Sequence, residues 1–172
     1  MSLPPLDYSY RGIMYVEDIR FTRPRKGLKP YKRSDAGRFW GSTFRLNNNS
    51  LVTIRGIYDT VQQVFEIPEN LTWLDLSFNK LTSINSEISL LENLKILYLH
   101  GNLISDLKSV LPELQKLEYL YSLTLHGNPI EEDKYYRQKI LSFLPRLKNL
   151  DFTNVTNADL IATDLYSLSK NN

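Results

Sequence analysis

Two short stretches of this 172-residue chain contain the same histidine, glycine and asparagine in the same order. "YLHGN" ends at Asn102, and "TLHGN" ends at Asn128. On neighbouring strands, His100 and His126 would lie roughly 5 Å apart, close enough to share a metal ion or to sense pH as a pair. The alternative is two exposed imidazoles without a ligand. We favour it, because the pattern places no carboxylate beside them and two ligands are too few for most metals.

Both stretches are parts of a longer repeat. From Leu71, Leu94 and Leu120 the chain reads "LTWLDLSFNKL", "LKILYLHGNLI" and "LYSLTLHGNPI". All three follow L-x-x-L-x-L-x-x-N-x-L/I, and their asparagines are 23 and 26 residues apart. This is the pattern and the period of a leucine-rich repeat. Weaker copies begin at Gly41 and Leu147, so we count about five repeats with atypical ends.

One repeat cannot bury its own leucines, so the copies must stack on one another. Alternation of leucine with polar residues predicts one strand per repeat in a parallel concave sheet, and the asparagines should bond the backbone at the turns. We expect a helical or irregular convex side, with a helix within residues 54–68. The fold class predicted is therefore an α/β solenoid.

The chain divides into three predicted parts. Residues 1–40 form a basic, aromatic-containing extension, residues 41–155 form the solenoid, and residues 156–172 form a C-terminal capping helix and tail. The capping helix is indicated by "TNAD", which resembles a capping box. Its apolar residues are expected to cover the open end of the solenoid; they are Leu160, Ile161, Leu165 and Leu168.

The concave face carries the first candidate site. Residues between the strand leucines point outward there, and most of them are polar. Trp73, Ile96 and Tyr98 are the exceptions and should be neighbours on adjacent strands. An exposed apolar cluster of this kind is typical of a binding hot spot, unless the N-terminal extension folds back over it. The polar residues expected at its rim are Arg45, Asp75, His100 and His126.

The extension carries the second candidate site. Residues 1–40 hold nine Lys or Arg against four Asp or Glu, whereas the rest of the chain holds 12 against 15. Aromatic residues interleave with the cations, so the segment is expected to dock on something. An acidic protein surface ranks first, the solenoid's own body second and nucleic acid third. The contact residues expected are Arg23, Arg25, Lys26, Lys29, Lys32 and Arg33.

The C-terminal third resembles the cap of small intracellular leucine-rich-repeat proteins, such as axonemal dynein light chain 1, the spliceosomal A-prime protein and the acidic nuclear phosphoprotein family. A second, narrower resemblance to one group of leucine-rich-repeat-containing proteins includes the N-terminal segment through "PPLDYSYRGI" (4–13) and "GLKPYKRS" (27–34), and it covers most of the chain. The cap residues that match are Asn128, Pro129, Tyr136, Arg137, Leu144, Pro145, Leu147, Leu150, Asp151, Val155 and Asp159. The resemblance implies an intracellular protein without enzymatic activity, and a role in cilia.

The residues themselves also indicate a binding module. The chain has no Cys, which excludes disulfides and thiolate chemistry, and it has no phosphate-binding glycine loop or hydrolase motif. The first residues show no signal peptide, and no apolar run is long enough to span a bilayer. We expect a cytoplasmic adaptor without cofactor, metal, membrane or small-molecule substrate. Its partners would be axonemal or microtubule-associated proteins, and the alternative is a nuclear or ribonucleoprotein adaptor.

Overall fold

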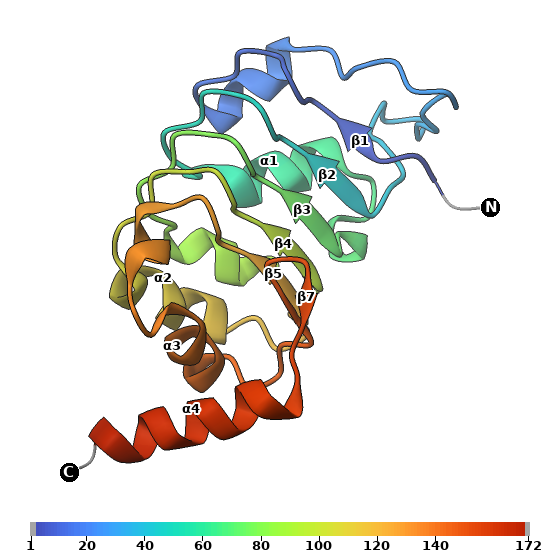
Figure 1. Ribbon diagram of the computed structural model, residues 1–172. Helices are drawn as coiled ribbons and strands as arrows, with labels where there is room; N and C mark the ends of the chain where they lie inside the picture. The colour runs from blue at the N-terminus through green and yellow to red at the C-terminus, as the bar shows by residue number, and fades with distance from the viewer. Residues whose placement is uncertain (1–2, 171–172) are drawn as a thin grey trace.

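A computed structural model describes residues 3–170 as a curved solenoid built on one seven-stranded sheet (Figure 1). The strands lie side by side in chain order, and all neighbours pair in parallel except the last two, which are antiparallel. Each repeat thus adds one strand beside the previous one. The strands are β1 (Leu6–Asp7), β2 (Thr43–Arg45), β3 (Trp73–Asp75), β4 (Ile96–Tyr98), β5 (Ser122–Thr124), β6 (Asn149–Leu150) and β7 (Thr153–Asn154).

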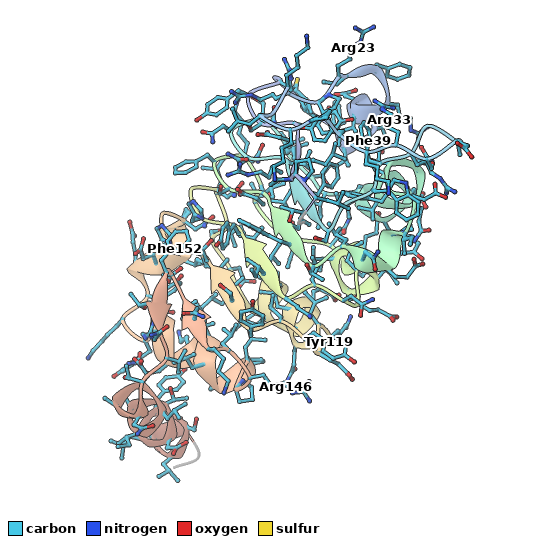
Figure 2. The ribbon with its side chains drawn as sticks, turned by 90° about the vertical axis from the view of Figure 1, so that its right-hand side faces the viewer. Arg23, Arg33, Phe39, Tyr119, Arg146 and Phe152 are labelled. Atoms are coloured by element: carbon cyan, nitrogen blue, oxygen red, sulfur yellow. The ribbon has the colours of Figure 1, made fainter. Side chains whose placement is uncertain are left out.

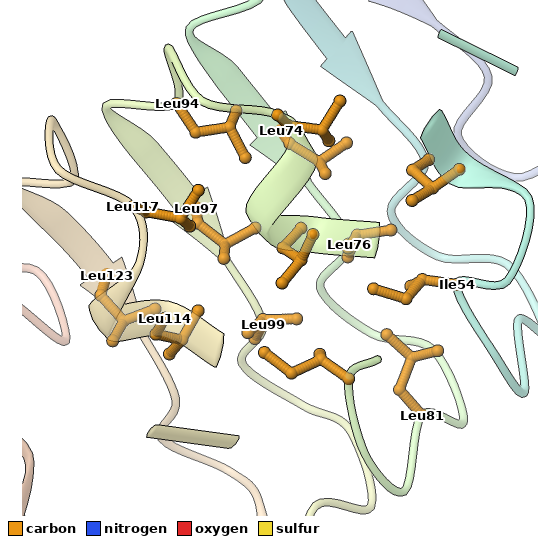
Figure 3. Packing of buried hydrophobic residues seen from close by; sticks show 14 of the residues in the cluster. Ile54, Leu74, Leu76, Leu81, Leu94, Leu97, Leu99, Leu114, Leu117 and Leu123 are labelled. Atoms are coloured by element: carbon orange, nitrogen blue, oxygen red, sulfur yellow. The ribbon is translucent and has the colours of Figure 1, made fainter. Parts of the chain in front are cut away.

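The register of the sheet stacks equivalent residues of successive repeats. Leu74 pairs with Leu97, and Leu97 pairs with Leu123. All three side chains are fully buried. Figure 3 shows these leucines packed against those of the convex side. Because truncation of one buried leucine to alanine costs about 2–5 kcal/mol, the stacked leucines contribute much of the stability of the fold.

A ladder of buried asparagines joins the coils at the turns that follow the strands. Asn102 Oδ1 accepts a hydrogen bond from the backbone nitrogen of Leu81 at 3.0 Å, and Nδ2 donates to the carbonyls of Leu76 and Leu99 at 3.0 and 2.9 Å. Asn79 and Asn128 repeat this arrangement one coil earlier and one coil later. The asparagine side chains therefore hydrogen-bond the backbone at the turns, as the repeat predicts.

The convex side consists of helices of different lengths. The predicted helix within residues 54–68 is present as α1 (Ile57–Val64), and the longer 26-residue repeat has room for α2 (Leu107–Gln115). The remaining helices before the last are η1 (Val16–Phe21), η2 (Pro68–Asn70), η3 (Ser86–Leu90), η4 (Pro129–Glu132) and α3 (Tyr136–Phe143). None of the helices in the described part of the chain is long and apolar enough to cross a membrane.

The sheet begins earlier than the predicted boundary at residue 41. β1 pairs with β2, Leu6 and Tyr8 are buried, and the Tyr8 ring contacts the Phe44 ring edge-on at 6.0 Å. Asn49 Nδ2 also donates to the Tyr8 carbonyl at 2.9 Å, so the asparagine ladder includes this segment. The first part of the extension is thus an N-terminal half-coil of the solenoid, because the apolar edge at Phe44 would otherwise face water.

The final helix, α4 (Asn157–Lys170), begins with the capping box that "TNAD" predicts. The Asp159 carboxylate accepts from the backbone nitrogen of Thr156 at 2.8 Å, and Thr156 Oγ1 accepts from the nitrogen of Asp159 at 3.2 Å. The helix packs against α3, and its Thr163 and Tyr166 are buried. The four apolar residues expected to cover the solenoid are instead exposed; they are Leu160, Ile161, Leu165 and Leu168. Residues 171 and 172 of the predicted tail lie outside the described part.

Candidate functional site

The sheet brings the predicted apolar residues of the concave face together. Trp73 pairs with Ile96 across β3 and β4, and the Trp73 and Tyr98 rings meet edge-on with their centroids 5.6 Å apart. All three side chains are half-buried. Burial, with Asp75 nearby, raises the pKa of Tyr98, so its hydroxyl stays protonated at neutral pH. The described part of the N-terminal extension does not form these contacts; it lies on the side of β2 away from β3, where β1 pairs with β2.

Two of the residues predicted at the rim of this face, Asp75 and Arg45, interact with other residues of the chain. Asp75 is 5% exposed, and its carboxylate accepts from the backbone nitrogen and the hydroxyl of Ser77 at 3.1 and 2.6 Å. The predicted rim residue Arg45 lies 3.9 Å from the Asp7 carboxylate. Asp75 therefore braces the turn after β3, while Arg45 is left half-exposed at the edge of the face.

The two histidines stack face to face. Their ring centroids are 4.8 Å apart and their planes differ by 5°. His100 is 8% exposed, with Nδ1 2.7 Å from the hydroxyl of Thr124, and His126 Nδ1 lies 3.2 Å from a carboxylate oxygen of Asp151. Burial, then the neighbouring His126, lowers the pKa of His100. No three potential metal ligands of the His, Cys, Asp or Glu type converge among the described residues.

Phe152 and Phe78 join this face and were not predicted. The Phe152 ring lies 5.2, 5.4 and 5.6 Å from the rings of Tyr98, His100 and His126. The Phe78 ring lies 5.0 Å from that of His100. In Figure 2, Phe152 lies across the sheet from Tyr119 and Arg146. We call the connected rings the aromatic cluster; its members are Trp73, Phe78, Tyr98, His100, His126 and Phe152.

Phe152 reaches the cluster because the chain reverses after β6. Asp151 and Phe152 both have positive φ, 54° and 61°, and form the two-residue turn between β6 and β7. The prediction that no carboxylate lies beside the histidines is wrong, because this turn places Asp151 against His126. The Asp151 carboxylate accepts from the backbone nitrogens of Leu125 and His126 at 2.7 and 3.0 Å. It also accepts from the Tyr136 hydroxyl at 2.9 Å, so the turn is tied to β5 and α3.

Both phenylalanines hold backbone conformations that such residues rarely adopt. Phe78 has a φ of 52°, at a turn position where other repeats place Asn48, Gly101 or Gly127. A bulky residue in left-handed backbone costs about 1–2 kcal/mol. Phe78 is 53% exposed and Phe152 is 61% exposed, so the burial of their rings offsets little of this strain energy. Strain kept for exposed aromatic rings is typical of a functional surface.

Gly101 provides the space for the Phe78 ring. A methyl group at Gly101 would lie 2.7 Å from Cδ1 of Phe78, and the φ of Gly101 is +67°. We expect Gly101→Ala to lower the free energy of unfolding by about 1–3 kcal/mol. At Gly127, which has the same φ, a methyl group would lie 3.3 Å from the backbone nitrogen of Gly101, a looser contact, so Gly127→Ala should cost less in the same urea titration. An equal loss in both variants would contradict this role for Gly101.

The buried histidine also predicts a pH dependence of stability. The unfolded chain binds a proton at the ordinary histidine pKa of about 6.5, whereas folded His100 resists protonation. The stabilisation is therefore complete above that pH and declines as the pH falls below it. Urea titrations between about pH 7 and pH 5 should show a loss of stability in the wild type that is smaller in His100→Gln. Parallel pH profiles for the two proteins would contradict the prediction.

Comparison with known proteins decides the family. A family model described as leucine-rich repeat matches residues 58–171. The chain belongs to the leucine-rich-repeat family. It is also 47% identical over 163 residues to the leucine-rich repeat-containing protein 51 of Homo sapiens, which covers 95% of this chain and 84% of that protein. The Mus musculus protein of the same name is 45% identical over the same length.

Two solved structures share the fold of this leucine-rich-repeat protein. A chain in the Drosophila melanogaster SNF/U2A' complex superposes with a TM-score of 0.63 at 23% identity, covering 82% of this chain and 78% of that one. A chain of the Chaetomium Mex67:Mtr2 subunits superposes with a TM-score of 0.51 at 24% identity, covering 63% and 74%. At these identities the likeness shows the fold alone. The family and the relatives make this chain a protein-interaction module.

Proposed function

We propose that this leucine-rich-repeat protein is an adaptor subunit of a larger intracellular assembly, and that the aromatic cluster is the surface that holds its partner. The observation that carries the proposal is the strained, exposed pair Phe78 and Phe152 beside Trp73 and Tyr98. Aromatic side chains that bury large areas with few rotatable bonds dominate the binding energy of protein interfaces.

The chemistry of the face supports recognition of a protein. The carboxylates of Asp75 and Asp151 are already hydrogen-bonded within the chain, and the most exposed members of the cluster are the rings of Phe78 and Phe152. A curved sheet with fixed side chains also loses little conformational entropy on binding. Both features favour a protein partner over nucleic acid, a membrane or a small-molecule substrate.

The assembly that we favour is the ciliary axoneme, with the protein in the cytoplasmic compartment. The support is the resemblance that covers most of the chain, including its N-terminal segment, and that implies a role in cilia. The cap alone is shared by axonemal and nuclear proteins and favours neither. The alternative is a nuclear or ribonucleoprotein adaptor, and its support is the likeness in fold to a chain of the SNF/U2A' complex.

Affinity purification of the tagged protein from ciliated cells tests the proposal. Wild type should recover axonemal proteins that co-extract with microtubules, and Trp73→Ala/Tyr98→Ala should lose them while its urea unfolding remains cooperative. Tyr119→Ala removes an exposed aromatic ring outside the cluster and should behave as wild type. Equal recovery by wild type and the double variant would overturn the proposed surface. Recovery of nuclease-sensitive complexes instead would favour the alternative assembly.

A further inference from the structure

We propose that the N-terminal end of the solenoid forms a basic trough that binds an extended acidic segment of a partner protein. Two adjoining hollows of about 540 and 280 Å³ lie there. They share Arg23, Pro24 and Arg33 in their walls. Figure 2 shows Arg23 and Arg33 close to Phe39 and well away from Phe152. The trough is therefore a surface separate from the aromatic cluster.

The walls of the trough carry positive charge alone. No Asp or Glu lines either hollow. Within residues 3–170, Arg38 is the one wall cation that forms an ion pair, with Glu66 at 2.9 Å. Arg33 donates to the Gly37 carbonyl at 2.8 Å, and the side chains of the remaining wall cations form no ion pair in the described part of the chain. This excess of positive charge favours a polyanionic occupant by charge complementarity. The wall cations are Arg20, Arg23, Lys26, Lys29, Arg33 and Arg38.

Backbone and ring contacts fix the trough to the edge of the sheet. The backbone nitrogen of Arg25 donates to the carbonyl of Asp7 in β1 at 2.6 Å, and the Tyr31 hydroxyl donates to the Arg25 carbonyl at 2.7 Å. The Arg33 guanidinium lies 3.9 Å from the centre of the Phe39 ring. Because these contacts hold the segment in place before binding, an occupant need not supply the free energy of ordering it.

The shape and the remaining wall residues define the occupant further. The two hollows lie on either side of shared wall residues, so one occupant must be extended to reach both, and Pro24, Leu28 and Pro30 place apolar surface among the cations. This pattern suits an extended peptide in which apolar residues separate the carboxylates. Single-stranded RNA fits less well, because it needs exposed rings on which bases stack. Tyr8 and Phe39 in the walls are buried, and Tyr31 packs edge-on against Phe39.

This inference rests on the proposed function in one respect: it takes the ligand of the trough to be a segment of a partner protein. Its test is fluorescence anisotropy of a labelled glutamate-rich peptide with leucines between the glutamates. Wild type should bind this peptide in low salt and bind its glutamine counterpart far more weakly. Arg23→Gln/Lys26→Gln should weaken binding about tenfold. Both residues are exposed, and no hydrogen bond of either side chain appears in the described part of the chain.

Two controls separate this site from general charge and from the aromatic cluster. Lys80→Gln/Lys148→Gln removes the same charge elsewhere on the surface and should leave peptide binding unchanged, as should Trp73→Ala/Tyr98→Ala. Three results would contradict the proposed trough. They are an equal loss of peptide affinity in Lys80→Gln/Lys148→Gln, equal affinity of wild type for the glutamine peptide, and no binding of the glutamate-rich peptide by wild type. Tighter binding of a polyuridine strand of equal charge would also contradict it. None of these outcomes bears on partner capture by the cluster.

Discussion

Asn102→Ala is expected to lower the free energy of unfolding by about 2–4 kcal/mol. Asn102 is 3% exposed, and its amide serves the backbone of two coils. Alanine would leave the Leu81 nitrogen and the Leu76 and Leu99 carbonyls buried without this partner. Urea denaturation followed by circular dichroism measures the loss directly.

Two further variants test the mechanism behind that loss. Asn102→Asp keeps an oxygen for the Leu81 nitrogen but removes the donor to both carbonyls, so it should destabilise at least as much as alanine. Asn70→Ala removes an exposed asparagine outside the ladder and should change stability little. A stable aspartate variant would show that the donating amide is not what joins the coils.

Arg137→Ala is expected to release the C-terminal cap and to cost about 2–3 kcal/mol. Its guanidinium bonds both carboxylate oxygens of Asp159 at 2.6 and 2.9 Å. It also donates to the Asn154 carbonyl at 3.2 Å and so ties α4 to the β6–β7 hairpin. Amide hydrogen exchange should show protection lost first in α4. Arg146→Ala, which removes one 3.4 Å bond to the Glu118 carbonyl, serves as the control.

The hydrogen-bonded pair of Arg137 and Asp159, which we call the clamp, also predicts how the stability of the cap responds to acid. The hydrogen bonds from Arg137, with those from Thr156, hold the pKa of Asp159 far below its ordinary value. A lowered carboxyl pKa gives stability that is complete above the unfolded pKa of about 3.9 and is lost as the pH falls further. Acid unfolding should therefore begin at higher pH in Arg137→Ala than in wild type. Coincident acid transitions would contradict the clamp.

The contacts between the central strands, β3 to β5, could be predicted because the repeat determines which residues of neighbouring strands lie side by side. A spacing of leucines at every second residue assigns one face of each strand, and identical coils must stack in register. Trp73, Ile96 and Tyr98 therefore meet as predicted. The histidine stack follows from the same register, although the spacing alone does not indicate that His100 becomes buried against Thr124.

The ends of the solenoid could not be predicted in the same way, because the repeat lapses there. At the C-terminal end, Val155 replaces the ladder asparagine, and the chain forms the Asp151–Phe152 turn instead of another coil. This turn carries Phe152 onto the concave face. At the N-terminal end, two alternating residues, Leu6 and Tyr8, are too short a pattern to indicate a strand, yet they complete the edge of the core.

Phe78 shows a different limit of sequence reasoning. The repeat marks its position as a turn, where glycine or asparagine would be expected, and the replacement by phenylalanine is visible in the sequence. What the sequence does not show is that the turn requires a positive φ and that the ring lies over Gly101 next to His100. The departure from local preference is thus itself a signal of function.

The most direct test of the aromatic cluster as a binding surface is to measure stability and partner capture together in Phe78→Asn/Phe152→Gly. Asparagine already occupies the equivalent turn position at Asn48, and an Asp-Gly pair suits the turn at residues 151 and 152. If the strain is kept for binding, the free energy of unfolding should stay the same or rise by about 1–2 kcal/mol, while partner recovery from ciliated cells is lost. Full recovery of the partner, or a large loss of stability, would contradict the claim that these rings are held in place for recognition.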